Sequence, residues 1–119
     1  MPGISVHVVD VSRGAPARGM AVDVFVVDAG GARHRVGGGR GGAAGGVADP
    51  ARGPGDGVGA GADEVELAAG AWYRAQGVDV GTPAFQERIV YRFEFVDPTP
   101  HLHLPFKLTP WGVSVWRGI

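Results

Sequence analysis

The sequence predicts an all-β fold, a β-sandwich with one short helix, and three observations lead to this prediction. Short segments rich in β-branched and aromatic residues recur along the chain, several of them with alternating apolar and polar positions. Turns rich in glycine and proline separate these segments. Only ELAAGAWYRAQG has the composition of a helix followed by a glycine stop. Many short strands, regular turns and one helix are typical of two packed sheets.

Two predicted strands open the chain. Residues 4–11 (ISVHVVDV) and 20–27 (MAVDVFVV) are rich in valine, and Val22, Val24 and Val26 share one face by the period of two. The intervening SRGAPARG is typical of a turn, because glycine frees the backbone and proline blocks continued pairing. A short turn between two strands predicts that they form an antiparallel pair.

Further strands are expected in the second half of the chain. A short strand around Val65 and Leu67 precedes the helix. The segment ERIVYRFEFVD is the clearest strand, because apolar and aromatic residues occupy every second position from Ile89 onward. Residues 102–116 are expected to form a final strand pair, or one long strand bent at its two prolines.

The length of 119 residues predicts a single domain over residues 1–119. Within it, residues 37–61 are mostly glycine, alanine, proline and aspartate, and we interpret them as a mobile surface loop. Glycine offers no side chain to bury and loses the most backbone entropy on ordering. A phosphate-binding loop would need a Gly-Lys-Ser/Thr or a dinucleotide fingerprint, and this segment has neither.

Composition excludes several classes of function. A formal net charge of −1 gives no electrostatic case for nucleic acid or an anionic membrane as a partner. The absence of cysteine excludes disulfides, thiolate nucleophiles and cysteine zinc sites. The start MPGISVHVVDV lacks the pattern of a signal peptide, and no apolar run is long enough to span a bilayer. We therefore expect a soluble cytoplasmic protein.

The histidines are the candidate catalytic residues. His7 lies in the middle of the first predicted strand, and His101 and His103 share one face of a later strand by the period of two. Histidine exchanges protons near neutral pH, so two imidazoles in one cavity could act as general base and general acid. The simpler interpretation is that each is a hydrogen-bonded strand residue. His34, between two arginines, is expected to be solvated.

A His-x-His pair with a third histidine elsewhere is also an arrangement that binds zinc. No carboxylate and no second pair supports such a site in this sequence. We therefore expect no metal and no cofactor.

Both ends of the chain resemble one family. The stretch ISVHVVDVSRGAPARGMAVDVF is similar to the opening of the transthyretin-like 5-hydroxyisourate hydrolases, a strand with Val/Thr-His-Val-Leu-Asp and then Gly-x-Pro-Ala. The stretch FQERIVYRFEFVDPTPHLHLPFKLTPWGVSVWRGI resembles their ending, with His-Tyr-His-Val-Pro and a terminal Tyr-Arg-Gly-Ser. The resemblance implies a prealbumin (transthyretin)-like β-sandwich. It also implies a homotetramer, a dimer of dimers, with small-molecule sites at the interface between dimers.

The resemblance further implies which residues form the site. In the family, a pair of histidines acts together with an arginine and the terminal tetrapeptide, which here reads Trp-Arg-Gly-Ile. The expected catalytic residues are His7, His103 and Arg117, and the expected substrate-binding residues are Trp116, Ile119, His101 and Gly46.

Three of these positions depart from the family pattern. Gly46 stands where the family has arginine, although Arg40 or Arg52 could replace it. The family arginine is expected to stabilise oxyanion charge, and the loss of one such donor typically costs about 10²–10³ in rate. Trp116 replaces a phenol with an indole that cannot accept a hydrogen bond, and Ile119 replaces a hydroxyl with apolar bulk. These changes predict a drier pocket that suits an anion less well.

Three functions remain open from the sequence. The first is a divergent member of the family that uses His7 and His103 on a small cyclic or carbonyl-containing metabolite, by hydrolytic ring opening or by cyclisation or rearrangement in specialised metabolism. The second is hydrolysis of 5-hydroxyisourate in purine catabolism, with a loop arginine in place of the missing one. The third is a non-catalytic transthyretin-like binder of a small aromatic molecule.

Overall fold

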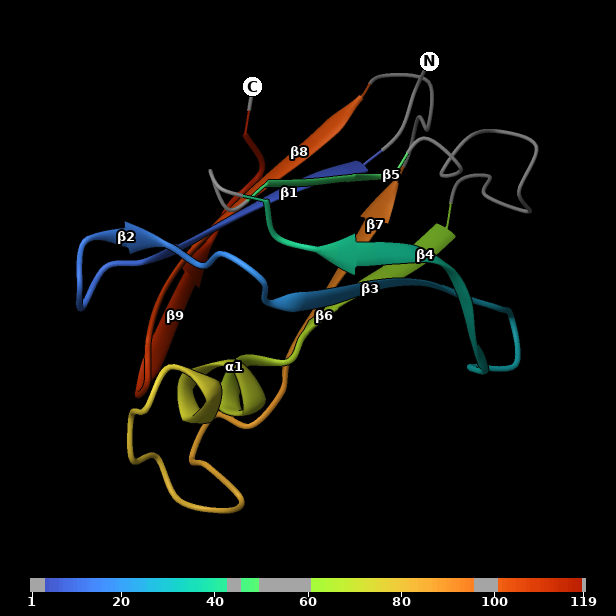
Figure 1. The fold of residues 1–119 in the computed structure, drawn as a ribbon. Coiled ribbons are helices and arrows are strands. Elements are labelled where there is room, and N and C mark those ends of the chain that lie inside the picture. The colour runs from blue at the N-terminus through green and yellow to red at the C-terminus, as the bar shows by residue number, and fades with distance from the viewer. Residues whose placement is uncertain (1–3, 43–45, 50–60, 96–100, 119) are drawn as a thin grey trace.

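The chain forms two β-sheets packed face to face, with one short helix at one end of the sandwich (Figure 1). The computed structural model describes residues 4–42, 46–49, 61–95 and 101–118. The predicted β-sandwich with one short helix is confirmed. Sheet A has the order β2 (Ala15–Pro16), β1 (Ile4–Asp10), β8 (Leu102–Thr109), β9 (Gly112–Val115), and β5 (Gly46–Asp49) also pairs with β1. Sheet B has the order β4 (Arg33–Arg40), β3 (Ala21–Val27), β6 (Gly61–Leu67), β7 (Ile89–Phe95).

Alternation of side chains sets the two faces of sheet A. In β1, Ile4, Val6 and Val8 are each 1% exposed, whereas Ser5 and His7 are partly exposed. The strand β8 has the same alternation. The apolar set of each strand therefore faces sheet B, and the polar set lies on the outer face of the sandwich. The largest fully buried side chains are Tyr73, Phe106, Ile4, Met20, Leu67, Leu104, Leu108, Val6, Val8, Val22, Val24 and Val65.

The helix α1 (Ala69–Ala75) follows β6 and covers the end of the sandwich at which β1 finishes. The Tyr73 hydroxyl donates a hydrogen bond of 3.0 Å to Asp10 Oδ1, and the Trp72 indole donates one of 2.8 Å to the Arg18 carbonyl. Both aromatic residues are buried. In the part of the chain that the structure describes, no helix is long and apolar enough to cross a membrane. A cytoplasmic location stays a prediction.

The predicted antiparallel pair of residues 4–11 with residues 20–27 is wrong. The strand β1 pairs in parallel with β8, whereas β3 lies in sheet B between β4 and β6. The turn folds Ala15–Pro16 back onto β1 as β2, and the chain then crosses to the other sheet. Ala17 and Met20, both 0% exposed, anchor this crossing in the core. The turn residues were recognised correctly, but burial of the following residues decided which sheet came next.

The predicted loop over residues 37–61 is wrong in part. Residues 37–40 belong to β4, and Gly46–Asp49 forms β5 on the edge of β1. Backbone groups supply the hydrogen bonds of a strand, so glycine can extend an edge strand without any side chain. The predicted loop also includes residues 43–45 and 50–60, which lie outside the described residues.

For the C-terminal residues, the sequence left open a strand pair or one long bent strand. The structure has the strand pair, β8 with β9. In the β8–β9 hairpin Phe106 lies opposite Val115, and beyond β9 the Gly118 N–H donates to the His103 carbonyl. Pro105 therefore falls in the interval between these two pairings. Its missing N–H faces the interrupted side of the ladder, where no hydrogen bond is lost.

Candidate functional site

His7 and His103 lie on the outer face of sheet A, on neighbouring strands. The parallel register places Ser5 beside His103 and His7 beside Pro105. Strands about 4.8 Å apart and a rise of about 6.6 Å over two residues place the two histidine Cβ atoms roughly 8 Å apart. That separation leaves room for a water molecule or the edge of a small molecule between the imidazoles. Residues from opposite ends of the chain thus share one face.

Ser5 connects two of the histidines. Its Oγ lies 2.7 Å from His103 Nδ1 and 2.9 Å from His101 Nε2. Ser5 is not among the site residues predicted from the sequence. The available signal was its position two residues before His7, which puts both side chains on one face of the strand.

Gly118 brings the C-terminal segment against the His103 ring. Its N–H donates a hydrogen bond of 2.7 Å to the His103 carbonyl. A Cβ at Gly118 would lie 2.8 Å from His103 Cδ2 and 3.3 Å from Pro105 Cδ, so only glycine permits this approach. Because Nδ1 faces Ser5 and Cδ2 faces Gly118, the outer edge of the ring, which contains Nε2, points away from the sheet.

Gly46 lies directly across from His7 in the β1–β5 pairing. Residues that are directly opposite in an antiparallel pair project to the same side of the sheet. The position that the resemblance assigns to the family arginine therefore adjoins His7, and in this chain it is a glycine. The loss of the arginine stays a prediction.

The structure does not bring either alternative arginine to the histidines. Arg40 Nη1 donates a hydrogen bond of 3.2 Å to the Gly19 carbonyl, and Arg40 lines a pocket of about 230 Å³ with Ala71 and Trp72 at the α1 end. Arg52 lies outside the described residues.

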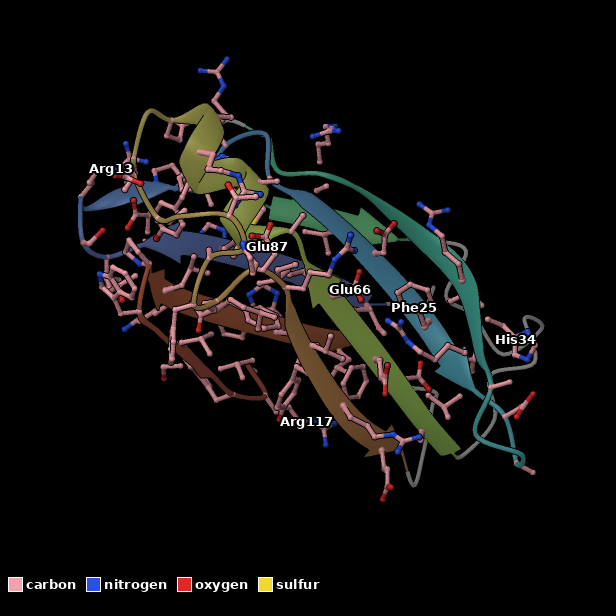
Figure 2. The ribbon with its side chains drawn as sticks, turned by 90° about the horizontal axis from the view of Figure 1, so that it is seen from below. Arg13, Phe25, His34, Glu66, Glu87 and Arg117 are labelled. Carbon is pink, nitrogen blue, oxygen red and sulfur yellow. The ribbon has the colours of Figure 1, made fainter. Side chains whose placement is uncertain are left out.

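The C-terminal tetrapeptide points in two directions. Lys107 Nζ lies 5.3 Å from the centroid of the Trp116 ring, so Trp116 packs beside an outward residue of β8. Arg117 lies between Trp116 and Gly118, and the alternation therefore turns its exposed side chain the other way, to the rim of the sandwich (Figure 2). The catalytic role of Arg117 stays a prediction. Ile119 lies outside the described residues.

The two outer faces differ in charge. On sheet B, Arg33 lies 2.7 Å from Glu64 and 3.0 Å from Glu66, which is labelled on β6 in Figure 2, so opposite charges are paired. On sheet A, the outward positions of β1 and β8 contain histidine, serine and Lys107 but no aspartate or glutamate. The outward positions of these two strands therefore carry one formal positive charge, at Lys107, and no negative charge.

His34 is exposed, as the sequence predicts, and lies on β4 in sheet B (Figure 2). Its Nε2 is 2.8 Å from Asp28 Oδ2. It takes no part in the site on sheet A. Within the described ranges, no three histidine, aspartate or glutamate side chains gather to hold a metal ion.

The two-sheet fold belongs to a known class of β-sandwich proteins. Residues 4–118 match the HIUase/Transthyretin family, and the chain belongs to this family. The predicted resemblance is confirmed.

Among its relatives, the chain is 35% identical over 115 residues to 5-hydroxyisourate hydrolase 2 of Rhizobium meliloti (strain 1021), covering 97% of this chain and 94% of the relative. Among solved structures, 5-hydroxyisourate hydrolase of Klebsiella pneumoniae matches with a TM-score of 0.79 and 26% identity over 100% of both chains. Sea bream transthyretin matches with a TM-score of 0.81 and 23% identity over 98% of this chain and 94% of that chain, which supports the fold alone.

Proposed function

We propose that this chain is a hydrolase that opens the ring of a small, carbonyl-containing metabolite, with His7 and His103 as its acid–base pair. The observation that carries this proposal is the placement of both imidazoles on the outer face of sheet A. His7 and His103 lie on neighbouring strands and are offset by two residues in the register. The named relatives, which are hydrolases, support the reaction class.

The two imidazoles have separate tasks in the proposed reaction. One imidazole takes a proton from water as the water oxygen forms a bond to a carbonyl carbon of the substrate. The C–N bond of the ring then breaks, and the other residue, as an imidazolium, gives its proton to the leaving nitrogen. Acid–base assistance of this kind contributes about 10²–10⁴ in rate.

5-Hydroxyisourate itself is a second candidate substrate, and Lys107 favours it. This compound is small, polar and anionic, and Gly46 removes the cation that the family places beside the first histidine. Lys107 is exposed on the outer face of β8, four residues after His103 on the same strand. Its ammonium group supplies a positive charge on the same face without an arginine from the Gly-rich segment.

Cyclisation or rearrangement in specialised metabolism would use the same two histidines on a more apolar compound beside Trp116, which is 42% exposed. Analysis of the product separates this reaction from hydrolysis, because only hydrolysis adds the elements of water. A non-catalytic binder would require neither imidazole for its affinity.

We also propose a homotetramer, a dimer of dimers. Among the described strands, β7 lies at one edge of sheet B and β9 at one edge of sheet A, and such edges can pair with a second copy of the chain. The outer face of sheet A would then meet a second dimer and enclose the histidines. Light scattering should give a mass of about four times the 12.2 kDa of one chain, and a stable monomer would contradict the assembly.

The activity test follows the ultraviolet decay of freshly generated 5-hydroxyisourate. The wild type should exceed the rate in buffer, whereas His7→Asn and His103→Asn should each lose about 10²–10⁴ in kcat/KM. The matched control is His34→Asn, which alters an exposed histidine of sheet B and should retain the wild-type rate. A wild-type rate equal to buffer rejects this substrate. Full activity in both site variants rejects the two-histidine mechanism.

A further inference from the structure

A hydrogen-bonded chain of three side chains lies on the outer face of sheet A. The Ser5 hydroxyl is 2.7 Å from His103 Nδ1 and 2.9 Å from His101 Nε2. His101 is exposed to solvent, whereas His103 is half-buried. We propose that His101, Ser5 and His103 form a proton relay between solvent and the His103 imidazole. The transfer to substrate rests on the proposed function, whereas the relay itself can be tested in the folded protein alone.

The single hydroxyl proton couples the two histidines. A serine hydroxyl donates one hydrogen bond and can accept others. If Ser5 donates to His103 Nδ1, the second contact requires a proton on His101 Nε2. If Ser5 donates to His101 Nε2, the first contact requires a proton on His103 Nδ1. The tautomers of the two imidazoles are therefore linked through Ser5.

Delivery of a proton begins with His101 as an imidazolium. The proton on its Nε2 moves to Ser5 Oγ, the hydroxyl proton moves to His103 Nδ1, and His103 Nε2 releases its proton to the leaving nitrogen of the substrate. His101 ends neutral with a proton on Nδ1, Ser5 keeps one hydroxyl proton, and His103 ends neutral as the other tautomer. Water then reprotonates the exposed His101. The same steps in reverse remove a proton from the site.

The orientation of the His103 ring suits this relay. Its Nδ1 faces Ser5, and its Cδ2 faces Gly118, which leaves Nε2 on the outer edge where a substrate can bind. A hydrogen bond at one ring nitrogen fixes what the other nitrogen can do. The hydrogen bonds to Ser5 that the structure describes involve the imidazoles of His103 and His101, so the relay distinguishes His103 from His7.

The first arm of the experiment uses NMR on the whole protein without substrate. Ser5→Ala should change the imidazole nitrogen shifts of both His101 and His103, because each loses its partner. In the tautomer of His103 that is protonated on Nδ1, it should also slow the exchange of that proton with water severalfold. Ser5→Thr keeps a hydroxyl and should restore both properties. The control Ser114→Ala removes an exposed serine from β9 of the same sheet and should leave them unchanged.

The second arm measures kcat with 5-hydroxyisourate. Ser5→Ala should lower kcat on the order of 10- to 100-fold, the usual effect of removing the partner that orients a functional imidazole, and Ser5→Thr should recover it. His101→Gln retains an N–H that can donate to Ser5 but cannot take up a proton. It should therefore lower kcat comparably while the His103 nitrogen shifts stay close to those of the wild type.

The two arms separate the relay from the proposed function. Unchanged nitrogen shifts and unchanged proton exchange in Ser5→Ala would overturn the relay, whatever the activity. Changed shifts with an unchanged kcat would show that the relay carries no catalytic proton and would also overturn it. A wild type that does not turn over 5-hydroxyisourate rejects that substrate, and proton exchange at His103 then decides the relay.

Discussion

Asp10 is a buried carboxylate, 0% exposed, at the end of β1. Burial alone would raise its pKa, but hydrogen bonds from Ser12, Arg13 and Tyr73 outweigh it and hold the pKa below the ordinary value. Asp10→Asn should lower the free energy of unfolding by about 1–3 kcal/mol, because the buried donors lose a charged acceptor. Urea unfolding measures this loss.

The control for this prediction is Asp23→Asn, which alters an exposed ion pair with Arg35. Exposed pairs contribute about 0–1 kcal/mol, so this variant should stay close to the wild type. Equal losses in the two variants would show that the network around Asp10 has no special role in stability.

Gly118 controls the position of the His103 ring. Because an added Cβ would lie 2.8 Å from Cδ2 of that ring, Gly118→Ala should displace the imidazole and lower kcat/KM on the order of 10- to 100-fold. Gly112→Ala is the control, since a Cβ there meets nothing closer than 4.0 Å. Equal activities in the two variants would contradict the close packing of the C-terminal segment on His103.

At the scale of single residues, the sequence placed His101 and His103 on one strand face by the period of two. It could not reveal Ser5 as their common partner, because that contact joins strands from opposite ends of the chain. The direction of Arg117 was equally hidden, since it depends on how the segment after β9 returns to His103.

The element β5 determines what adjoins His7. Gly46→Arg would place a guanidinium on the outer side of the sheet, directly across from the imidazole. It should raise the rate of 5-hydroxyisourate hydrolysis by about 10²–10³, the usual contribution of one oxyanion donor. Gly46→Met adds comparable bulk without charge and should give no gain. A rate unchanged by arginine would show that Gly46 does not occupy the family arginine position.

The segment after α1 is held by an ion pair. Arg74 donates to both carboxylate oxygens of Glu87, at 2.7 and 2.6 Å, and a Cβ at Gly70 would lie 2.6 Å from that carboxylate. The Arg74 hydrogen bonds, together with the Ala84 N–H, lower the pKa of Glu87 from 4.5 to about 2.

A lowered pKa in the folded state means that this ion pair stabilises the fold above the unfolded-state pKa. Its contribution should therefore be complete above pH 4.5 and should be lost as the pH falls from 4.5 toward about 2. Urea unfolding across this range should show a decline in the free energy of unfolding that Glu87→Gln makes shallower. A variant that declines as steeply as the wild type would contradict the assignment.

At the scale of elements, the sequence predicted most strand segments because their apolar periodicity is local. The pairing partners of the strands were harder to predict from the sequence, since pairing depends on which sheet buries each apolar face. Thus residues 4–11 and 20–27 were recognised as strands but wrongly paired, and β5 was hidden because its glycine and alanine residues carry little strand signal.

For the whole molecule, the parallel pairing of β1 with β8 is the decisive feature. It brings the first and last parts of the chain together in sheet A and leaves both histidines on the outer face, away from the core. On the outer face of sheet B, Arg33 is paired with Glu64 and Glu66, whereas the outer face of sheet A carries imidazoles, a hydroxyl and a lysine. The outer face of sheet A is therefore the face on which the proposed reaction would take place.

A double-mutant cycle on kcat/KM for 5-hydroxyisourate tests most directly whether His7 and His103 act as one unit. Each single Asn variant should lose about 10²–10⁴, and the double variant should lose little more than the slower single one, because residues that act together are not additive. A single variant that retains the wild-type rate, or losses that simply multiply in the double variant, would contradict a shared acid–base site on sheet A.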